Sequence, residues 1–245
     1  MINILLPMAG GTPYFDQAEY PFPKPLIEIG NTPIIQKAIQ YLERISGDKR
    51  FIFLVQGDDC SKFHLDSVLK LLTDGQGVII KMTKETRGAA CSALMAIDHI
   101  NNDEPLLIMN YDQIIEEDIN TILSFFQDNQ YDAGVVTFET IHPRWSYVRL
   151  DNAGNVVEAA EKRPISKNGI AGCYYFRKGS DFVDAVMKMI RKDSMVNGSF
   201  YVAPCLNEMV LANRKIGIYP IDIDSFHTFY TPQKIKEYEE KIRKA

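Results

Sequence analysis

The sequence predicts an α/β fold in which a mixed, mostly parallel central sheet is flanked by helices. Apolar runs alternate with amphipathic helical patterns over the first 110 residues. The first run, residues 2–8, is apolar at nearly every position, as in a strand buried on both faces of a parallel sheet. After residue 112 the alternation changes, and the turn-rich segment 151–154 is of the kind that joins antiparallel strands.

The first half alternates strand and helix. Apolar residues spaced three and four apart predict a helix over residues 33–45, after the strand at 2–8. The next segments predict a strand at 51–55, a helix at 63–72, a strand at 78–82, a helix at 89–100 and a strand at 105–109. Because strand–helix–strand connections join parallel strands, these strands are expected to lie parallel in one sheet.

The second half is more irregular. In order, we expect a helix at 119–126, a strand at 134–138, a hairpin of strands 147–150 and 155–157, a strand at 172–176, helices at 182–190 and 202–210, a strand at 216–221 and a helix at 231–244. Neither a linker, a repeat nor a charge block divides the sequence. We therefore expect a single domain over residues 1–245.

Composition excludes several classes of protein. The 245 residues include 27 basic and 32 acidic ones, a net charge of −5, whereas a protein that neutralises nucleic-acid phosphates normally has a basic excess. Apolar stretches fall short of the ~20 residues that span a membrane. The four cysteines are scattered, and the first residues do not resemble a secretory signal. We expect a cytoplasmic protein with neither nucleic acid nor membrane as a partner.

Candidate ligand-binding residues follow the predicted strands, because open α/β sheets bind ligands beyond the carboxyl ends of their strands. Gly10 and Gly11 follow the first strand and would let backbone amides approach a phosphate, although such pairs are also common turns. Lys24 stands between two prolines that restrict its backbone, or is a surface lysine in a turn. Asp112 follows the strand at 105–109, where a carboxylate can hold Mg²⁺ or cap a helix.

A charged pair, Glu161 and Lys162, leaves the predicted hairpin. A carboxylate can accept hydrogen bonds from hydroxyl groups, and an ammonium can bind a phosphate. Together they can orient a phosphorylated acceptor.

The order of these motifs resembles that of the sugar-phosphate nucleotidyltransferase superfamily. The motifs are, in chain order, Gly10-Gly11, Pro23-Lys24-Pro25-Leu26, Thr86-Arg87-Gly88-Ala89-Ala90, Asn110-Tyr111-Asp112-Gln113, Glu161-Lys162 and Gly172-Cys173-Tyr174-Tyr175-Phe176. Residues 226–232 look like a variant of the superfamily's late W-x-D-x-G-T-P element. The resemblance covers nearly the whole chain and implies a Rossmann-like GT-A nucleotide-diphospho-sugar transferase fold.

The resemblance implies a nucleotide-binding half over residues 1–115. The residues expected to contact the nucleoside triphosphate are Ala9, Gly10 and Gly11 in the loop, Gly88 and Ala89 at the base, and Lys24 and Asp112 at the phosphates. Of these, Lys24 and Asp112 are expected to be catalytic, with Asp112 as the Mg²⁺ ligand.

The resemblance implies an acceptor-binding half over residues 116–245. The expected acceptor contacts are Trp145 and Ser146, in a segment similar to the family's P-x-x-Y-G-V, together with Glu161, Lys162 and Gly172. Lys162 is expected to be catalytic as well, by holding the acceptor phosphate.

The implied reaction is Mg²⁺-dependent nucleotidyl transfer, the chemistry of EC class 2.7.7. A phosphorylated acceptor, expected to be a sugar phosphate, attacks the α-phosphorus of a nucleoside triphosphate, and pyrophosphate leaves. Such enzymes commonly supply the synthesis of capsule and other surface polysaccharides.

The sequence departs from the family pattern at two places. In the loop pattern G-x-G-x-R, the second glycine falls on Thr12 and the arginine on Tyr14, so Arg87 or Lys84 would have to supply the missing cation. In the late element, the second metal-binding aspartate falls on Thr228 and the glycine on Tyr230.

Asp224, or Asp222 beside it, is the expected replacement for the second metal carboxylate. The same Asp222-Ile223-Asp224 has the spacing of the D-x-D motif of GT-A glycosyltransferases. A glycosyltransferase that consumes a nucleotide-sugar is therefore an alternative, and a catalytically silent nucleotide-binding module is another. The base, the acceptor and the oligomeric state are left open by the sequence.

Overall fold

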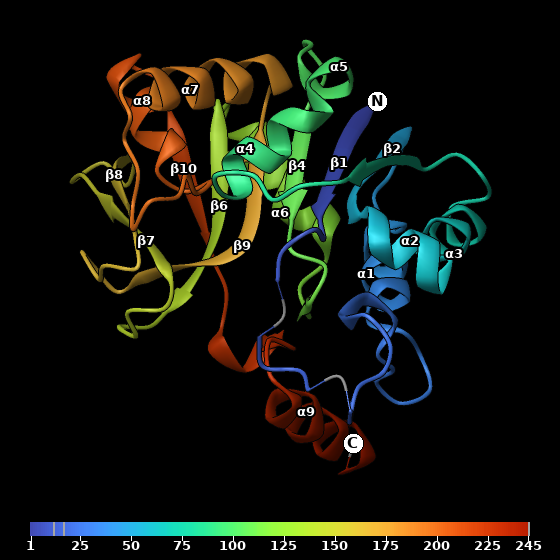
Figure 1. The fold of residues 1–245 in the computed structure, drawn as a ribbon. Helices are drawn as coiled ribbons and strands as arrows, with labels where there is room; N and C mark the ends of the chain where they lie inside the picture. The colour runs from blue at the N-terminus through green and yellow to red at the C-terminus, as the bar shows by residue number, and fades with distance from the viewer. Residues whose placement is uncertain (12, 17, 245) are drawn as a thin grey trace.

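The computed structural model describes residues 1–11, 13–16 and 18–244 and contains a nine-stranded sheet (Figure 1). Its strands are β1 (Ile2–Pro7), β2 (Lys49–Gln56), β3 (Val78–Met82), β4 (Leu106–Met109), β6 (Ala133–Glu139), β7 (Ser146–Leu150), β8 (Val156–Glu161), β9 (Asn168–Phe176) and β10 (Ile216–Pro220). Along the main path the order is β10-β6-β9-β4-β1-β2-β3. A separate two-stranded sheet pairs β5 (Gln113–Ile115) with β11 (Phe226–Thr228).

The central sheet is mixed and mostly parallel. Strands β1, β2, β3 and β4 pair in parallel, as do β6 and β10. Only β9, among the strands of the main path, runs antiparallel to its neighbours β4 and β6. The hairpin β7–β8 is attached to β9 through the pairing of Tyr147 with Gly169. These pairings confirm the predicted fold class.

Helices cover both faces of the sheet, because successive side chains of a buried strand point to opposite faces. Ile4 and Leu6 of β1 belong to one apolar cluster, and Leu5 to the other. The first cluster contains side chains from α1 (Ile34–Leu42), α2 (Gly57–Phe63), α3 (Leu65–Leu72), α6 (Ile119–Asp128) and α9 (Pro232–Lys244). The second contains side chains from α4 (Ala89–Ala93), α5 (Ile97–Ile100), α7 (Gly179–Arg191) and α8 (Cys205–Leu211).

Most predicted elements are present, and the differences have local causes. A helix was expected over residues 63–72, but His64 adopts a left-handed backbone (φ 54°) that separates α2 from α3. The expected helix at 89–100 is divided by the 3₁₀ turn η2 (Leu94–Ala96). The helix expected from residue 202 begins only after Pro204, which lacks the N–H that a helix interior requires.

The strands β5 and β11 were not predicted. Each has three residues, and they pair across more than 100 residues of sequence, with Thr228 opposite Gln113. So short a segment shows too little alternation of apolar and polar residues to be recognised. None of the helices in the described part of the chain is both long and apolar enough to cross a lipid bilayer.

Candidate active site

Two pockets lie on either side of the segment that follows β4. The hairpin pocket, about 240 Å³, is lined by Asn110 and by residues of the hairpin β7–β8. The loop pocket, about 460 Å³, is lined by Tyr111 and by the chain that follows β1. Consecutive residues at the carboxyl end of one central strand thus border different pockets, and Asp112 comes directly after them. This is the edge of the sheet at which ligands of open α/β folds bind.

Lys24 and Asp112 form an ion pair at this edge. Lys24 begins the 3₁₀ turn η1 (Lys24–Leu26), and its side chain is only 7% exposed, whereas that of Asp112 is 23% exposed. The ammonium lies 5.5 Å from the ring centroid of Phe15 and 5.8 Å from that of Tyr111. A buried ammonium needs a compensating charge, which the carboxylate supplies. The fold thus joins two predicted catalytic residues that are 88 positions apart.

Asp112 is suited to hold Mg²⁺ as a single protein carboxylate. The partner strand places Thr228 opposite Gln113, so the neighbouring position offers a hydroxyl group rather than a second carboxylate. Among the described residues, no group of three or more His, Cys, Asp and Glu side chains is arranged to hold a metal ion. Protein-bound Mg²⁺ commonly uses one or two carboxylates and takes its other ligands from water and substrate phosphates. Asp112 meets the lower limit of that requirement.

Asp224 does not lie beside Asp112, contrary to expectation. It belongs to the exposed 3₁₀ turn η3 (Ile223–Ser225), where its backbone N–H donates to the carboxylate of Asp222 (2.8 Å). The carbonyl of Ser225 accepts a hydrogen bond from Glu116 (2.9 Å) at the far end of the β5–β11 ladder. At about 3.3 Å per residue, the four steps of ladder from Asp112 to Glu116 span about 13 Å, and Asp224 lies one residue beyond Ser225, the partner of Glu116. The antiparallel register therefore keeps the two carboxylates from sharing a metal ion.

The hairpin pocket brings together most of the predicted acceptor contacts. Trp145, Ser146, Glu161 and Gly172 all line it. The register of β7 and β8 places Ser146 opposite Glu161, and the serine hydroxyl donates a hydrogen bond to the carboxylate. Burial raises the pKa of Glu161 and outweighs the opposing effects of Ser146 and Lys162. The pocket thus contains a half-buried carboxylate held in a defined orientation.

Lys162 does not itself line the hairpin pocket but contacts Tyr201, which does. Its backbone is left-handed (φ 53°), and its N–H donates to the carbonyl of Trp145 (3.0 Å). The ammonium donates to the hydroxyl of Tyr201 (2.7 Å), which also lines the pocket, and this hydrogen bond raises the pKa of Lys162. The exposed ammonium of Lys162 therefore comes directly after the half-buried carboxylate of Glu161 in the chain.

A side chain of α8 keeps β8 in place. The amide of Asn207 accepts a hydrogen bond from the N–H of Ala159 (2.8 Å) and donates one to the carbonyl of the same residue (2.9 Å). Within the described residues β8 pairs with β7 alone, so Asn207 occupies the place of a second neighbouring strand. Glu161 ends the strand that is fixed in this way.

Two predicted glycines are required by geometry. Gly172 has φ +60°, and an added Cβ would overlap the side-chain amide of Asn110. Gly88 has φ +114°, and a Cβ there would lie 2.5 Å from the carbonyl oxygen of Phe200. Both positions combine a left-handed backbone with a close approach, so any larger residue would force its neighbours to move.

The predicted nucleotide contacts are divided between the two pockets. Gly10, Gly11 and Lys24 line the loop pocket, whereas Ala89 lines the hairpin pocket. The cause is a pair of backbone hydrogen bonds that join Phe200 to the residues flanking Gly88 and Ala89: Phe200 donates to the carbonyl of Arg87 (2.7 Å) and accepts from Ala90 (3.0 Å). They hold the start of α4 beside the hairpin pocket.

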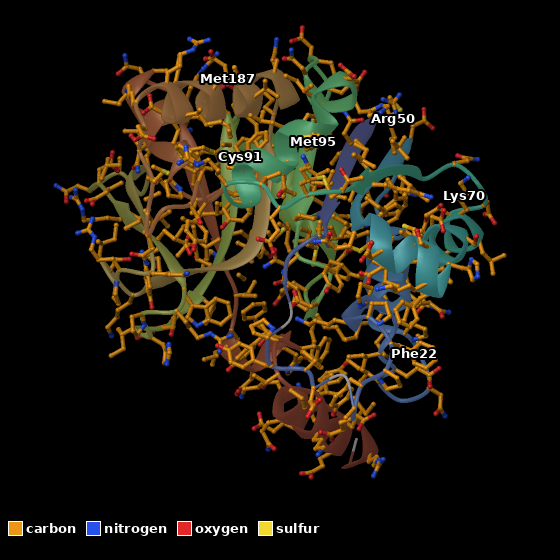
Figure 2. All side chains as sticks on the ribbon, viewed as in Figure 1. Phe22, Arg50, Lys70, Cys91, Met95 and Met187 are labelled. Carbon is orange, nitrogen blue, oxygen red and sulfur yellow. The ribbon has the colours of Figure 1, made fainter. Side chains whose placement is uncertain are left out.

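The loop pocket is lined by aromatic side chains and by two glycines whose side-chain directions are open. Phe22 is 58% exposed and lies edge-on to Phe63 (6.0 Å between centroids), below α2 and α3 in the view of Figure 2. An added Cβ at Gly10 or Gly11 would meet nothing within 4 Å. Next to them, the carbonyl of Ala9 accepts a hydrogen bond from the side chain of Gln56. Packing therefore does not require glycine at either loop position.

The structure also identifies site residues that the sequence did not indicate. Tyr201 carries no recognisable signal, and Gln56 is simply the last residue of β2. Arg144, which lines the hairpin pocket, lies in the segment that resembles P-x-x-Y-G-V and could have been suspected for that reason. Arg87 and Lys84, the expected substitutes for the loop arginine, are exposed and line neither pocket. Thr12 lies outside the described residues.

Comparison with known sequences identifies the family of this chain. Residues 20–197 match the profile of the nucleotidyl transferase family. The bifunctional protein GlmU of Methanococcus aeolicus is 21% identical over 200 residues, which are 80% of this chain and 44% of that protein. The low-salt glycan biosynthesis nucleotidyltransferase Agl11 of Haloferax volcanii is 23% identical over 161 residues, 63% of this chain and 43% of that protein. The chain thus spans less than half the length of these curated relatives.

Solved structures share the fold over nearly the whole chain. A nucleoside-diphosphate-sugar pyrophosphorylase from Vibrio cholerae RC9 superposes with a TM-score of 0.80 at 21% identity, covering 97% of this chain and 99% of that one. A UDP-glucose pyrophosphorylase complexed with UDP-glucose superposes with a TM-score of 0.77 at 17% identity, covering 100% and 99%. These likenesses confirm the Rossmann-like fold.

Proposed function

Because the chain belongs to the nucleotidyl transferase family, we propose that it transfers a nucleoside monophosphate from a nucleoside triphosphate to a phosphorylated acceptor. The observation that supports this most directly is the Lys24–Asp112 ion pair: Lys24 lines the loop pocket, and Asp112 directly follows Asn110 and Tyr111, which border the two pockets. A phosphate oxygen of the acceptor forms a bond to the α-phosphorus. The bond from that phosphorus to the bridging oxygen breaks, and pyrophosphate leaves with the electron pair.

Catalysis of this kind needs positioning and charge rather than a covalent intermediate. In the absence of ligand, Lys24 compensates Asp112, and its ammonium is then at hand for the phosphates of a bound nucleotide. Asp112 would hold Mg²⁺, which when bound neutralises the charge that develops on phosphate oxygens. Gly10 and Gly11 present backbone without side chains along the loop pocket, where phosphates can approach closely.

We propose that the acceptor is a sugar phosphate bound in the hairpin pocket. The carboxylate of Glu161 accepts hydrogen bonds from sugar hydroxyl groups, and the ammonium of Lys162 binds the phosphate. Trp145 and Gly172 shape the walls of the pocket. In this proposal residues 1–115 mainly bind the nucleotide and residues 116–245 mainly bind the acceptor, within one domain.

The product would be a nucleotide-sugar that supplies surface polysaccharide synthesis in the cytoplasm. A relative named for glycan biosynthesis supports this role. The glycosyltransferase alternative loses support, because the D-x-D carboxylates belong to an exposed turn in which one caps the other.

Release of pyrophosphate tests the proposal. The chain is incubated with Mg²⁺, each nucleoside triphosphate in turn and a panel of sugar phosphates, and pyrophosphate is measured with and without chelator. We expect release with at least one pair of substrates, and its loss when chelator is added. Release of nucleoside diphosphate from nucleotide-sugars would instead indicate a glycosyltransferase, and nucleotide binding without turnover would indicate a silent module.

A further inference from the structure

The guanidinium of Arg144 lies over two aromatic rings, and Arg144 lines both the hairpin pocket and a neighbouring cavity of about 340 Å³ that Tyr230 also lines. Its Cζ lies 3.3 Å from the ring centroid of Tyr230 and 4.4 Å from that of Trp145. In the part of the chain that the structure describes, no carboxylate forms an ion pair with this guanidinium. Glu161 also lines the hairpin pocket, but its carboxylate accepts a hydrogen bond from Ser146 instead.

Stacking restricts how this cation can be used. A guanidinium is planar and carries its N–H donors in that plane, so aromatic rings over its faces leave the edges available. The rings also limit the rotamers of a long side chain, which lowers the entropy lost when it binds a ligand. A planar, preoriented donor edge matches the oxygen atoms of a phosphate. The arrangement therefore favours an anion at the open edge of Arg144.

The loop that follows β1 approaches this cation through aromatic contacts. Tyr14, the uncharged residue at the position of the loop pattern's arginine, lies edge-on to Tyr230 (6.3 Å between centroids). Tyr230 in turn stacks on Arg144. The ring of Tyr230 thus contacts both the guanidinium of Arg144 and Tyr14, the loop residue that stands where the family pattern has an arginine. Ala89, an expected nucleotide contact, lines the same pocket as Arg144.

We propose that Arg144 binds a phosphate group of the nucleoside triphosphate from the hairpin side of the cleft, and so supplies the positive charge that the loop lacks. This inference rests on the proposed function, because it assumes that a nucleoside triphosphate is the ligand. It assigns to the acceptor half of the chain a contact with the nucleotide. Tyr230 and Trp145 act as positioning residues, since they hold the guanidinium and do not themselves carry charge.

Binding of inorganic tripolyphosphate to the full chain, measured by calorimetry, tests the proposal without turnover. Arg144→Gln should weaken binding roughly 10- to 100-fold, as for the loss of a charged hydrogen-bonding partner. Arg144→Lys should recover only part of the affinity, because lysine lacks the planar donor edge. Arg149→Gln is the matched control: this exposed arginine of the same hairpin pairs with Glu158, and its loss should leave binding unchanged.

The double variant Tyr14→Arg/Arg144→Gln provides the sharper test. Restoring an arginine to the loop should return most of the lost affinity. If Arg144→Gln leaves tripolyphosphate binding unchanged and weakens only glucose 1-phosphate binding, the cation serves the acceptor and the proposal fails. It fails equally if Arg87→Gln, rather than Arg144→Gln, weakens tripolyphosphate binding.

The two proposals can fail separately. If the wild-type chain releases no pyrophosphate but loses tripolyphosphate binding in Arg144→Gln, the proposed reaction is refuted and the phosphate contact stands. If pyrophosphate is released with unchanged nucleotide KM and unchanged kcat in Arg144→Gln, the reaction stands and the contact is refuted. Circular dichroism spectra of each variant establish that the fold is retained.

Discussion

The hairpin pocket and the loop pocket differ in how their residues are held in place. In the hairpin pocket, strand register sets Ser146 opposite Glu161, and the glycine at 172 is packed against Asn110. The loop pocket is lined largely by the chain between β1 and α1, in which η1 supplies Lys24 and the glycines at 10 and 11 touch nothing in their side-chain directions.

Because of this difference, substitutions in the two pockets should affect stability and ligand binding differently. A change in the hairpin pocket disturbs packed strands and should alter the free energy of unfolding together with ligand affinity. A change at the loop glycines should alter ligand affinity alone. Asp112 directly follows the two residues that border the pockets and pairs with Lys24 of the loop pocket, so its loss should affect the reaction more than any change confined to one pocket.

Asp112→Asn should have the largest effect. The amide keeps the shape of the side chain but removes the charge that pairs with Lys24 and would hold Mg²⁺. We expect kcat/KM for pyrophosphate release to fall by about 10²- to 10³-fold, comparable to the loss of one catalytic charge contact. Lys24→Met should produce a loss of similar size, and full activity in both variants would contradict the site assignment.

Gly172→Ala and Gly10→Ala form a matched pair that tests the contrast directly. The first adds a Cβ where φ is +60° and Asn110 is already in contact, so unfolding in urea should show a loss of about 2 kcal/mol or more. The second adds a Cβ in open space and should change stability by less than about 0.5 kcal/mol. It should instead weaken nucleotide binding. Equal losses of stability in the two variants would contradict the proposed difference between the two pockets.

Asn207→Ala should have an intermediate effect. It removes two hydrogen bonds to Ala159 and with them the support of β8. We expect a loss of about 1–3 kcal/mol in the free energy of unfolding and a higher KM for the acceptor. The KM for the nucleotide should be unchanged, because the loop pocket does not contact β8. A rise confined to the nucleotide KM would place the support of β8 outside acceptor binding.

The pH dependence of Glu161 should give the smallest effect. Burial raises its pKa in the folded protein above the ordinary value of 4.5, so the folded state binds this proton more tightly than the unfolded state. The resulting stabilisation is fully present below pH 4.5 and is lost as the pH rises through the folded pKa. Relative to Glu161→Gln, the wild type should therefore lose stability over that window. Parallel pH profiles for the two proteins would show that burial does not shift this pKa.

Ser146→Ala sharpens the same measurement. The serine hydroxyl donates to the carboxylate and favours its ionised form, so its removal should raise the pKa of Glu161 further. The window in which stability is lost should move to higher pH. Acceptor binding through the ionised carboxylate should move with it.

The sequence predicted the elements whose signal is local. The apolar run of β1 and the spaced apolar residues of α1 each satisfy their own period, so the alternating first half follows from the order of residues. The same order placed Asp112 just after a strand and Lys24 between two prolines. The motifs also indicated two residues that border the hairpin pocket, Glu161 and Gly172.

The tertiary structure decided what depends on register and on contacts between distant segments. The three-residue pairing of β5 with β11 separates Asp224 from Asp112, and this register cannot be predicted from the spacing of residues in the sequence. The hydrogen bonds of Phe200 carry Ala89 to the hairpin pocket, away from the loop glycines. Local periods arise from a few neighbouring residues, whereas the position of a charge in a cleft depends on which strands pair. The amino-acid order alone therefore determined the fold class and the candidate residues, and only the folded chain determined which of them meet.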